Sequence, residues 1–233
     1  MAYNPLHKLS DNIRAIRIAL EDKIPSAEEL GLLQRYSGFG GIKAILYPDA
    51  PRAEWEKLGA TAADMRLYEP MQELHELLKE KFTEPEYKSI LQSLKNSVLT
   101  AFYTPSVVPQ TLYQVLQEQG VSIRNIYEPS AGAGIFISEA VNSLKGLEHI
   151  TAVEKDVLTG KVLQSIGKAL PVKNEVHIGG FEDTPGDHKG KHDLVISNIP
   201  FGNFTVHDPD YPQEGISGKI HTCWVRPILS ACP

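Results

Sequence analysis

The sequence predicts an α/β fold in which an all-helical region, residues 1–98, precedes a domain with a mostly parallel sheet, residues 99–233. In the first region, apolar residues recur at the three- and four-residue spacing of amphipathic helices. Beyond about residue 100, short apolar runs alternate with helical patterns, which is typical of a parallel sheet covered by helices. There a glycine-containing turn joins a strand-like run to a helical one, and such turns position ligands in doubly wound sheets.

The composition is that of an ordinary globular protein of 233 residues, with 42% apolar and 22% charged residues. A net charge of -6 gives no bulk attraction to nucleic acid, so such a contact needs a local patch or must come from elsewhere. Without a signal-peptide core or a membrane-length apolar run, we expect a cytoplasmic protein with no membrane partner. The two cysteines lie near the C-terminus without a CxxC spacing, which argues against a disulfide framework or a zinc site.

Helix-start signals divide residues 1–98. Asn4 and Pro5 can cap and start a first helix, and residues 26–29 form a capping-box pattern for a second. Residues 71–78 give another amphipathic helix, and residues 83–86 cap one more. The expected apolar faces of the first and last of these helices are Leu9, Ile13, Ile16 and Leu20, and Tyr87, Ile90, Leu91, Leu94 and Val98.

The segment Gly38-Phe39-Gly40-Gly41 interrupts this helical pattern. It can be a flexible contact loop or a helix stop with a tight turn, and the punctuating role of glycine favours the second interpretation. No catalytic constellation is evident in residues 1–98.

The second part contains alternating elements. Residues 102–105 lead into a helix whose buried side is expected to hold Val108, Leu112, Val115 and Leu116. A strand at 121–127, a helix at 135–144, a strand at 150–153, a helix at 158–166 and a strand at 175–178 follow in order. The last apolar run, residues 194–196, is expected to be a strand buried on both faces.

The turn Glu128-Pro129-Ser130-Ala131-Gly132-Ala133-Gly134 joins the first of these strands to a helix. Gly132 and Gly134 permit positive φ and let a ligand approach the backbone N–H groups at the helix start. Such a turn fits a dinucleotide, S-adenosylmethionine or tight packing alone. The third glycine of the dinucleotide pattern is absent, and Glu128 would repel a pyrophosphate but could accept a hydrogen bond from an ammonium group.

Glu154 stands at the end of the next predicted strand, twenty residues after Gly134. At this place a carboxylate can accept hydrogen bonds from both hydroxyls of a ribose. A solvated residue at a strand end is the alternative, and the upstream turn favours the ribose role.

The order of four motifs resembles that of the amino-group DNA methyltransferases. The motifs are Phe-Tyr-Thr-Pro at 102–105, Glu-Pro-Ser-Ala-Gly-Ala-Gly at 128–134, Glu154, and Asn-Ile-Pro-Phe at 198–201. Over about residues 100–215 the chain is similar to their N6-adenine branch, most of all to type-I-like or helicase-associated methylases of bacterial mobile elements. The resemblance implies a Rossmann-like S-adenosylmethionine methyltransferase sheet. It also implies methyl transfer to adenine N6 of DNA, in a restriction-modification or mobile-element system.

The same resemblance implies that the corner at 198–201 acts on the base. An adenine amino nitrogen is a poor nucleophile because its lone pair is delocalised into the ring. The side-chain oxygen of Asn198 and the backbone carbonyl of Ile199 would accept its hydrogens and free the lone pair. Pro200 would fix the direction of that carbonyl, and Phe201 would stack on the base. The family has proline in place of Ile199, and an ordinary proline turn with a core phenylalanine is the alternative.

The resemblance also places cofactor contacts outside the glycine turn. Thr104 and Pro105 would lie near the methionine end of S-adenosylmethionine, and Phe181 would pack on its adenine. Thr104 and Pro105 also fit a helix cap with proline at its first position, and both roles can hold together. Family members often carry an acid where this chain has Gly180, so Glu182 or Asp183 would replace it. No metal is expected: His188 and His192 are four residues apart but lack further ligands.

The family's sheet continues for further strands beyond the corner, whereas this chain has only about thirty residues left. Residues 222–233 differ in composition and hold both cysteines. We therefore expect a C-terminally truncated domain, through an early stop or a frame change. In such a sheet the 193–197 strand lies beside the first strand, and its open edge could pair with a protein partner or a second copy.

The sequence therefore predicts an S-adenosylmethionine-dependent DNA adenine-N6 methyltransferase that binds DNA partly through regions missing from this chain. One alternative is an inactive cofactor- or nucleic-acid-binding remnant that works with a partner. Another is methylation of a protein glutamine amide, since a similar corner serves planar nitrogens generally. The helical region and Phe-Tyr-Thr-Pro favour DNA over protein.

Overall fold

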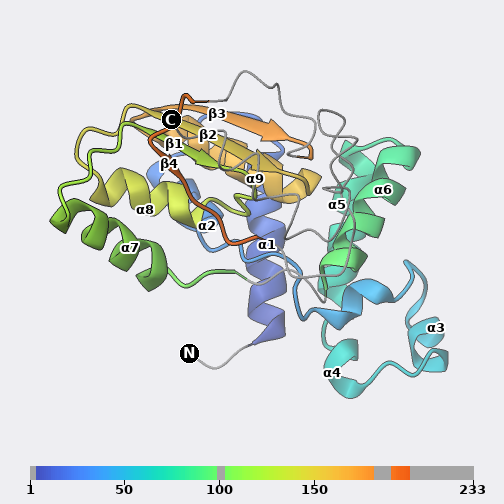
Figure 1. Ribbon diagram of the computed structural model, residues 1–233. Helices are drawn as coiled ribbons and strands as arrows, with labels where there is room; N and C mark the ends of the chain where they lie inside the picture. Colours follow the sequence, from blue (N-terminus) through green and yellow to red (C-terminus); the bar gives the residue numbers. More distant parts are fainter. Residues whose placement is uncertain (1–3, 99–102, 181–189, 200–233) are drawn as a thin grey trace, which may run out of the picture.

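The computed structural model describes residues 4–98, 103–180 and 190–199 (Figure 1). Its helices are α1 (Pro5–Ala19), α2 (Ala27–Leu33), η1 (Lys43–Leu46), α3 (Arg52–Lys57), α4 (Ala62–Met65), α5 (Tyr68–Lys81), α6 (Glu84–Ser97), α7 (Val107–Glu118), α8 (Ile135–Ser143) and α9 (Val157–Ala169). Its strands are β1 (Asn125–Glu128), β2 (His149–Glu154), β3 (Lys173–Ile178) and β4 (Leu194–Val195). As predicted, helices fill the described residues up to Ser97, and every described strand follows from Asn125 onward.

The strands form one parallel, Rossmann-like sheet in the order β3-β2-β1-β4. β1 pairs with β2 on one side and with β4 on the other, so that Glu128 lies opposite Ala152 and Tyr127 opposite Val195. The strand order therefore reverses at β1, and such a reversal creates a crevice at the carboxyl ends of the strands. The predicted parallel sheet is confirmed, and so is the place of the 193–197 strand beside the first strand.

Helices α8 and α9 cover one face of the sheet, with α7 beside α8 (Figure 1). α1 and α2 pack against α9 and form a second layer beyond it. α5 and α6 stand at the end of the molecule toward which the strands point (Figure 1). The helical region thus reaches around α9 to the carboxyl edge of the sheet.

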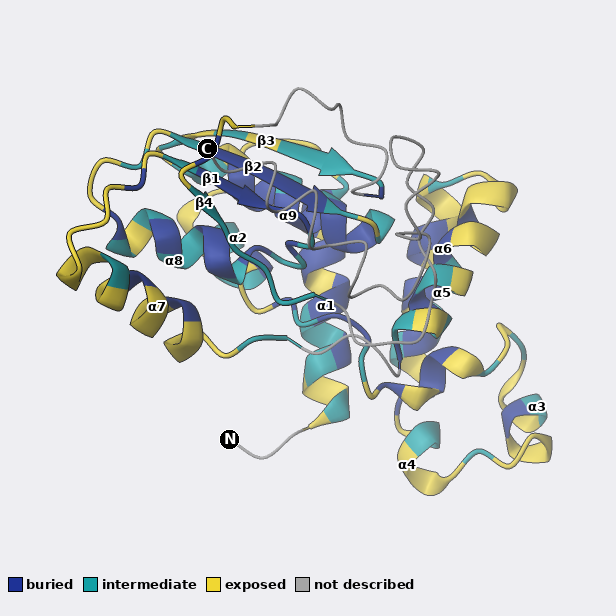
Figure 2. Ribbon diagram, in the orientation of Figure 1, coloured by how far each residue is buried: buried dark blue, intermediate teal, exposed yellow. Residues whose placement is uncertain are grey.

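The largest hydrophobic cluster joins the helical region to the α/β part (Figure 2). It contains buried residues of α1, α2, α5 and α6 together with Leu158, Val162 and Ile166 of α9. Because burying one such side chain contributes about 1.5–3 kcal/mol, this shared core stabilises both parts together. The domain boundary at residue 98 stays a prediction.

Local capping signals place the helix starts correctly. The side chain of Asn4 accepts a hydrogen bond from the backbone N–H of Leu6 at 3.0 Å. Ser26 with Glu29, and Thr83 with Glu86, form the predicted capping boxes.

The prediction for the buried face of α7 is wrong. Val108, Leu112 and Val115 are 41%, 44% and 48% exposed. Tyr113 is buried instead, and its hydroxyl donates to the backbone carbonyl of Phe136 in α8 at 2.9 Å. Because α7 meets α8 through this side, the valine face turns outward, and only Leu116 of the predicted set packs inward.

Strand β4 is shorter and less buried than predicted. It contains two residues, both half-buried, because it has one neighbouring strand in the described part of the sheet. Phe181, Glu182, Asp183, Pro200 and Phe201 lie outside the described residues, as do residues 222–233. No helix in the described ranges is long and apolar enough to span a membrane.

Candidate functional site

A cavity of about 830 Å³ opens at the carboxyl ends of β1, β2 and β4. The turn after β1, the end of β2 and the segment after β4 line one wall, and α6 with residues 36–39 lines the other. The predicted site residues that line it are Thr104, Glu128, Ser130, Ala131, Gly132, Glu154, Asn198 and Ile199. Pro105, Pro129 and Gly134 do not line it.

The turn after β1 is held by backbone hydrogen bonds to β2. The N–H of Ala131 donates to the carbonyl of Val153 at 2.9 Å, and the N–H of Gly132 donates to Oε2 of Glu154 at 2.8 Å. Gly132 and Gly134 have φ of 55° and 79°, as predicted for the turn. A Cβ on Gly134 would lie 2.6 Å from Leu163, so packing on α9 requires this glycine, whereas Gly132 faces the cavity.

Glu154 braces the site through both carboxylate oxygens. Besides the bond from Gly132, its Oε1 accepts the backbone N–H of Asp156 at 2.8 Å. Burial raises the pKa of Glu154 to about 7, against the lowering effect of these donors. Glu154 is therefore not the solvated residue of the alternative interpretation. Each oxygen keeps a second lone pair for a further donor.

Glu128 is the buried acid of the cavity. It is 1% exposed, and burial together with the nearby Glu154 carboxyl raises its pKa well above the usual range. Its Oε2 meets no hydrogen-bond donor among the described residues. A buried carboxyl oxygen without a donor is unfavourable. An ammonium or hydroxyl ligand in the cavity would satisfy it.

The segment after β4 brings Asn198 and Ile199 to the same cavity as Gly132. Ser197 Oγ donates to the carbonyl of Ser130 at 3.4 Å, which ties this segment to the glycine turn. The amide nitrogen of Asn198 donates to Oγ1 of Thr104 at 3.0 Å. Thr104 therefore positions Asn198. It is not the helix cap, because Ser106 is the N-cap of α7.

The second wall was not foreseen, because residues 1–98 showed no catalytic pattern. Ser89, Gln92, Ser93, Asn96 and Ser97 of α6 line the cavity opposite the glycine turn. They recur at spacings of three and four residues, so they share one face of the helix. A polar face on an amphipathic helix is usually solvated, so the sequence alone gives no sign of a site there.

The segment 36–39 contacts the glycine turn through Tyr103. A Cβ added to Gly38 would lie 2.6 Å from the Tyr103 ring, which is too close for a contact. A Cβ added to Gly132 would lie 3.7 Å from the same ring. Gly38 has φ of 62° and Gly41 of 77°, in line with the predicted tight turn. The segment is nevertheless also a contact segment, since Gly38 and Phe39 line the cavity.

A buried asparagine of α1 fixes this segment. Asn12, 0% exposed, donates through Nδ2 to the carbonyl of Gly38 at 2.7 Å and accepts the N–H of Ser37 at 3.0 Å. Tyr36 adds a hydrogen bond between its hydroxyl and Oγ1 of Thr159 in α9, at 3.0 Å. A buried amide with both ends satisfied is a rigid support, so the first helix helps to shape the cavity.

His192 serves packing. It is 3% exposed, and its ring stacks on that of Tyr127 with 5.2 Å between the ring centroids. In the described part of the chain, no three His, Cys, Asp or Glu side chains are placed to hold a metal ion.

The chain is similar in sequence to a phage protein and shares a distant structural likeness with a bacterial protein. No protein-family model matches the chain. It is 30% identical over 129 residues to the defense against restriction protein B of Escherichia phage P1. That match covers 52% of this chain but 5% of the phage protein, so this chain spans a small part of its relative.

A crystal structure described as a class I S-adenosylmethionine-dependent methyltransferase from Listeria monocytogenes gives a TM-score of 0.47 at 14% identity. The superposition covers 96% of this chain and 70% of that one. A score of this size does not establish a shared fold, so the fold class stated above rests on the sheet itself.

Proposed function

We propose that this chain is the catalytic part of an S-adenosylmethionine-dependent methyltransferase acting on adenine N6 of DNA. The observation that carries the proposal is that one cavity is lined both by the glycine turn and by Asn198 and Ile199. A cofactor site and a nitrogen-activating corner on separate faces could not cooperate, whereas here they share one cleft.

The residues present fit S-adenosylmethionine. Glu128 offers a buried carboxyl oxygen that lacks a donor among the described residues, as a methionine ammonium group requires. Glu154 holds remaining lone pairs for ribose hydroxyls, and Gly132 allows close approach of the ligand to the backbone. When bound, this cofactor supplies an electrophilic methyl group.

The chain's own part in the reaction is to activate the acceptor nitrogen. The amide nitrogen of Asn198 donates to Oγ1 of Thr104, which leaves its side-chain oxygen as the end that can accept. Together with the carbonyl of Ile199 it would accept the two amino hydrogens and localise the nitrogen lone pair. Acceptors aimed in advance lower the barrier by about 2–4 kcal/mol each.

DNA is proposed as the substrate on two grounds. The order of motifs is that of adenine methylases, and the phage relative is named for defense against restriction, a process directed at DNA. From the name of the same relative, we propose a place in a mobile element that must survive restriction. Because the match covers only a small part of the phage protein, DNA binding would draw on regions outside this chain.

The test is transfer of a tritiated methyl group from S-adenosylmethionine to unmethylated DNA by the wild-type chain and by Asn198→Ala. We expect labelled DNA with the wild type, at least a hundredfold slower labelling with the variant, and equal cofactor affinity by calorimetry. The expected loss corresponds to the removal of one preorganised acceptor.

Two results would contradict the proposal. Cofactor binding without transfer to any DNA would favour the partner-dependent remnant. Label on protein instead of DNA would favour glutamine methylation.

A further inference from the structure

Hydrogen-bonding side chains of helix α6 line the cavity in addition to the glycine turn and Asn198. The second wall of the cavity is the face of α6 that carries Ser89, Gln92, Ser93, Asn96 and Ser97, named here the α6 polar face. The glycine turn and Asn198 line the same cavity. Figure 1 shows α6 standing beyond the carboxyl ends of the strands.

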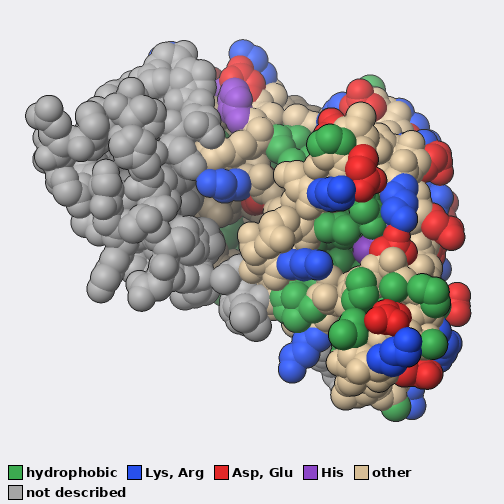
Figure 3. All heavy atoms as spheres, turned by 90° about the vertical axis from the view of Figure 1, so that its right-hand side faces the viewer, with side chains coloured by type: hydrophobic (Ala, Val, Ile, Leu, Met, Phe, Trp, Pro, Cys, Tyr) green, Lys and Arg blue, Asp and Glu red, His purple; other side chains and the backbone are tan. Residues whose placement is uncertain are grey.

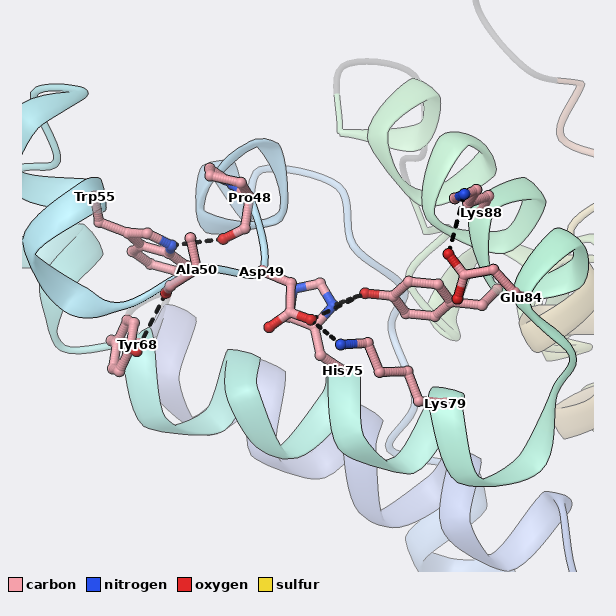
Figure 4. Close-up of polar contacts among 10 residues, drawn as sticks. Pro48, Asp49, Ala50, Trp55, Tyr68, His75, Lys79, Glu84 and Lys88 are labelled. Atoms are coloured by element: carbon pink, nitrogen blue, oxygen red, sulfur yellow. Dashed lines mark hydrogen bonds and ion pairs between the residues drawn. The ribbon is translucent and has the colours of Figure 1, made fainter.

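All five side chains of the α6 polar face are uncharged hydrogen-bonding groups. Gln92 Nε2 donates to Oδ1 of Asn96 at 3.0 Å, so the two amides are aligned along the helix. Lys88 and Glu84 of α6 pair with each other at 3.1 Å and do not line the cavity (Figure 4). Figure 3 shows acidic and basic side chains interspersed on the side of the molecule that it presents.

Helix α6 is held firmly against its neighbours. On its inner side Ile90 and Leu94 are buried in the largest core cluster. The hydroxyl of Tyr87 lies 2.9 Å from Nδ1 of His75 in α5, next to the ion pair of Lys79 with Asp49 (Figure 4). The α6 polar face is therefore presented on a rigid element.

The cavity side of α6 is fixed as well. Ser93 Oγ donates to Oδ2 of Asp156 at 2.6 Å, which joins α6 to the loop that follows Glu154. Since Asp156 also caps α9 by accepting the N–H of Thr159 at 2.8 Å, one residue connects both walls of the cavity. The distance between the α6 polar face and the cofactor turn is thereby set.

The charges around the cavity decide what this wall can bind. Glu128, Glu154 and Asp156 line it together with one basic residue among the described lining, Lys155, so the cavity offers little net positive charge to a phosphate. Oε2 of Glu128, in a side chain 1% exposed, meets no hydrogen-bond partner among the described residues, so a ligand with a donor could satisfy it. A neutral, planar group with several donors and acceptors on its edge matches side-chain amides, and a nucleobase is such a group. The side-chain amide of a glutamine substrate would need only the acceptors of Asn198 and Ile199, and so would not require this second wall.

We propose that the α6 polar face, and Gln92 with Asn96 above all, binds the edge of an unpaired base of single-stranded DNA in the cavity that Asn198 also lines. This inference rests on the proposed function, because it assigns the acceptor side of the same cleft. It makes the helical region a determinant of acceptor specificity in addition to a structural support.

The experiment measures binding of a short fluorescent single-stranded oligonucleotide containing one adenine, by anisotropy, with S-adenosylhomocysteine present. The test variant is Gln92→Leu with Asn96→Leu, which keeps side-chain size and removes the amides. The matched control is Gln114→Leu on α7, another helical glutamine with a partner four residues on, Glu118 at 2.8 Å, but outside the cavity. We expect at least tenfold weaker oligonucleotide binding for the double variant, no change for the control, and unchanged cofactor affinity for both.

The outcomes separate this inference from the proposed function. If the wild type binds cofactor and oligonucleotide and the double variant binds both equally well, the inference is overturned and the proposed function stands. If the wild type binds cofactor and a glutamine peptide but no oligonucleotide, the wall serves a protein and the inference also fails. If the wild type binds no cofactor, the proposed function itself fails.

Discussion

Glu128 is the residue on which the interpretation of the site depends most. Its carboxyl is buried in the cavity, lies near Glu154 and meets no donor in the described part of the chain. A buried polar group without a partner is destabilising, so stability alone does not account for an acid here. A ligand that carries a hydrogen-bond donor would satisfy it.

We predict that the wild type loses stability relative to Glu128→Gln, in the ligand-free state, as pH rises above about 4.5. The folded state holds the proton of Glu128 because burial raises the pKa of that carboxyl, whereas the unfolded chain releases it near the ordinary value of 4.5. Where the folded state binds more protons, the free energy of unfolding decreases with pH. Glu154, with its pKa raised to about 7, adds a fall of the same sign that the variant keeps.

The measurement is urea denaturation of both proteins from about pH 4 to about pH 8. Parallel stability curves for the wild type and Glu128→Gln would show that this carboxyl titrates alike in both states. That result would contradict the inference that a ligand supplies a hydrogen-bond donor to Glu128.

At the scale of elements, local signals were predictable and packing partners were not. The caps at Asn4, Ser26 and Thr83 depend on residues within one turn, so the sequence alone identifies them. The outward face of α7 depends on Tyr113 reaching α8, which periodicity cannot reveal. The two loops of the cleft were predictable because each follows a parallel strand. The α6 wall comes from a helix distant in sequence, so no strand end indicated it.

The segment 36–39 supports a prediction at this scale: Gly38→Ala weakens cofactor binding about tenfold. A Cβ there would overlap the Tyr103 ring, which packs next to Gly132 in the cofactor turn. Gly59→Ala is the matched control, because Gly59 also has positive φ, 84°, but nothing lies within 4 Å of its Cβ position. Both variants bear the strain of a left-handed alanine, about 1–2 kcal/mol, and only the first displaces a ring.

Calorimetry with S-adenosylhomocysteine and urea denaturation check this prediction together. Equal affinities for Gly38→Ala and Gly59→Ala would mean that Tyr103 does not transmit the position of the segment to the glycine turn. If both variants lose stability but bind S-adenosylhomocysteine equally well, Gly38 serves only to form the turn.

At the scale of the whole molecule, the helical region and the sheet form one functional unit. The core shared by α1, α2, α5, α6 and α9 holds α6 near the ends of the strands. The Ser93–Asp156 hydrogen bond links α6 to the loop after β2. The sequence predicts the helical region and the sheet as two successive parts of the chain. It does not predict the contacts between them, because contacts between distant segments leave no local sequence pattern. The cavity belongs to neither part alone.

The most direct test of the central claim is a crystal structure of the chain grown with saturating S-adenosylhomocysteine. The account predicts the ligand in the cleft, its amino group at Glu128, its ribose hydroxyls at Glu154, and its sulfur facing Asn198. A ligand bound elsewhere, or an empty cleft at saturating ligand, would contradict it.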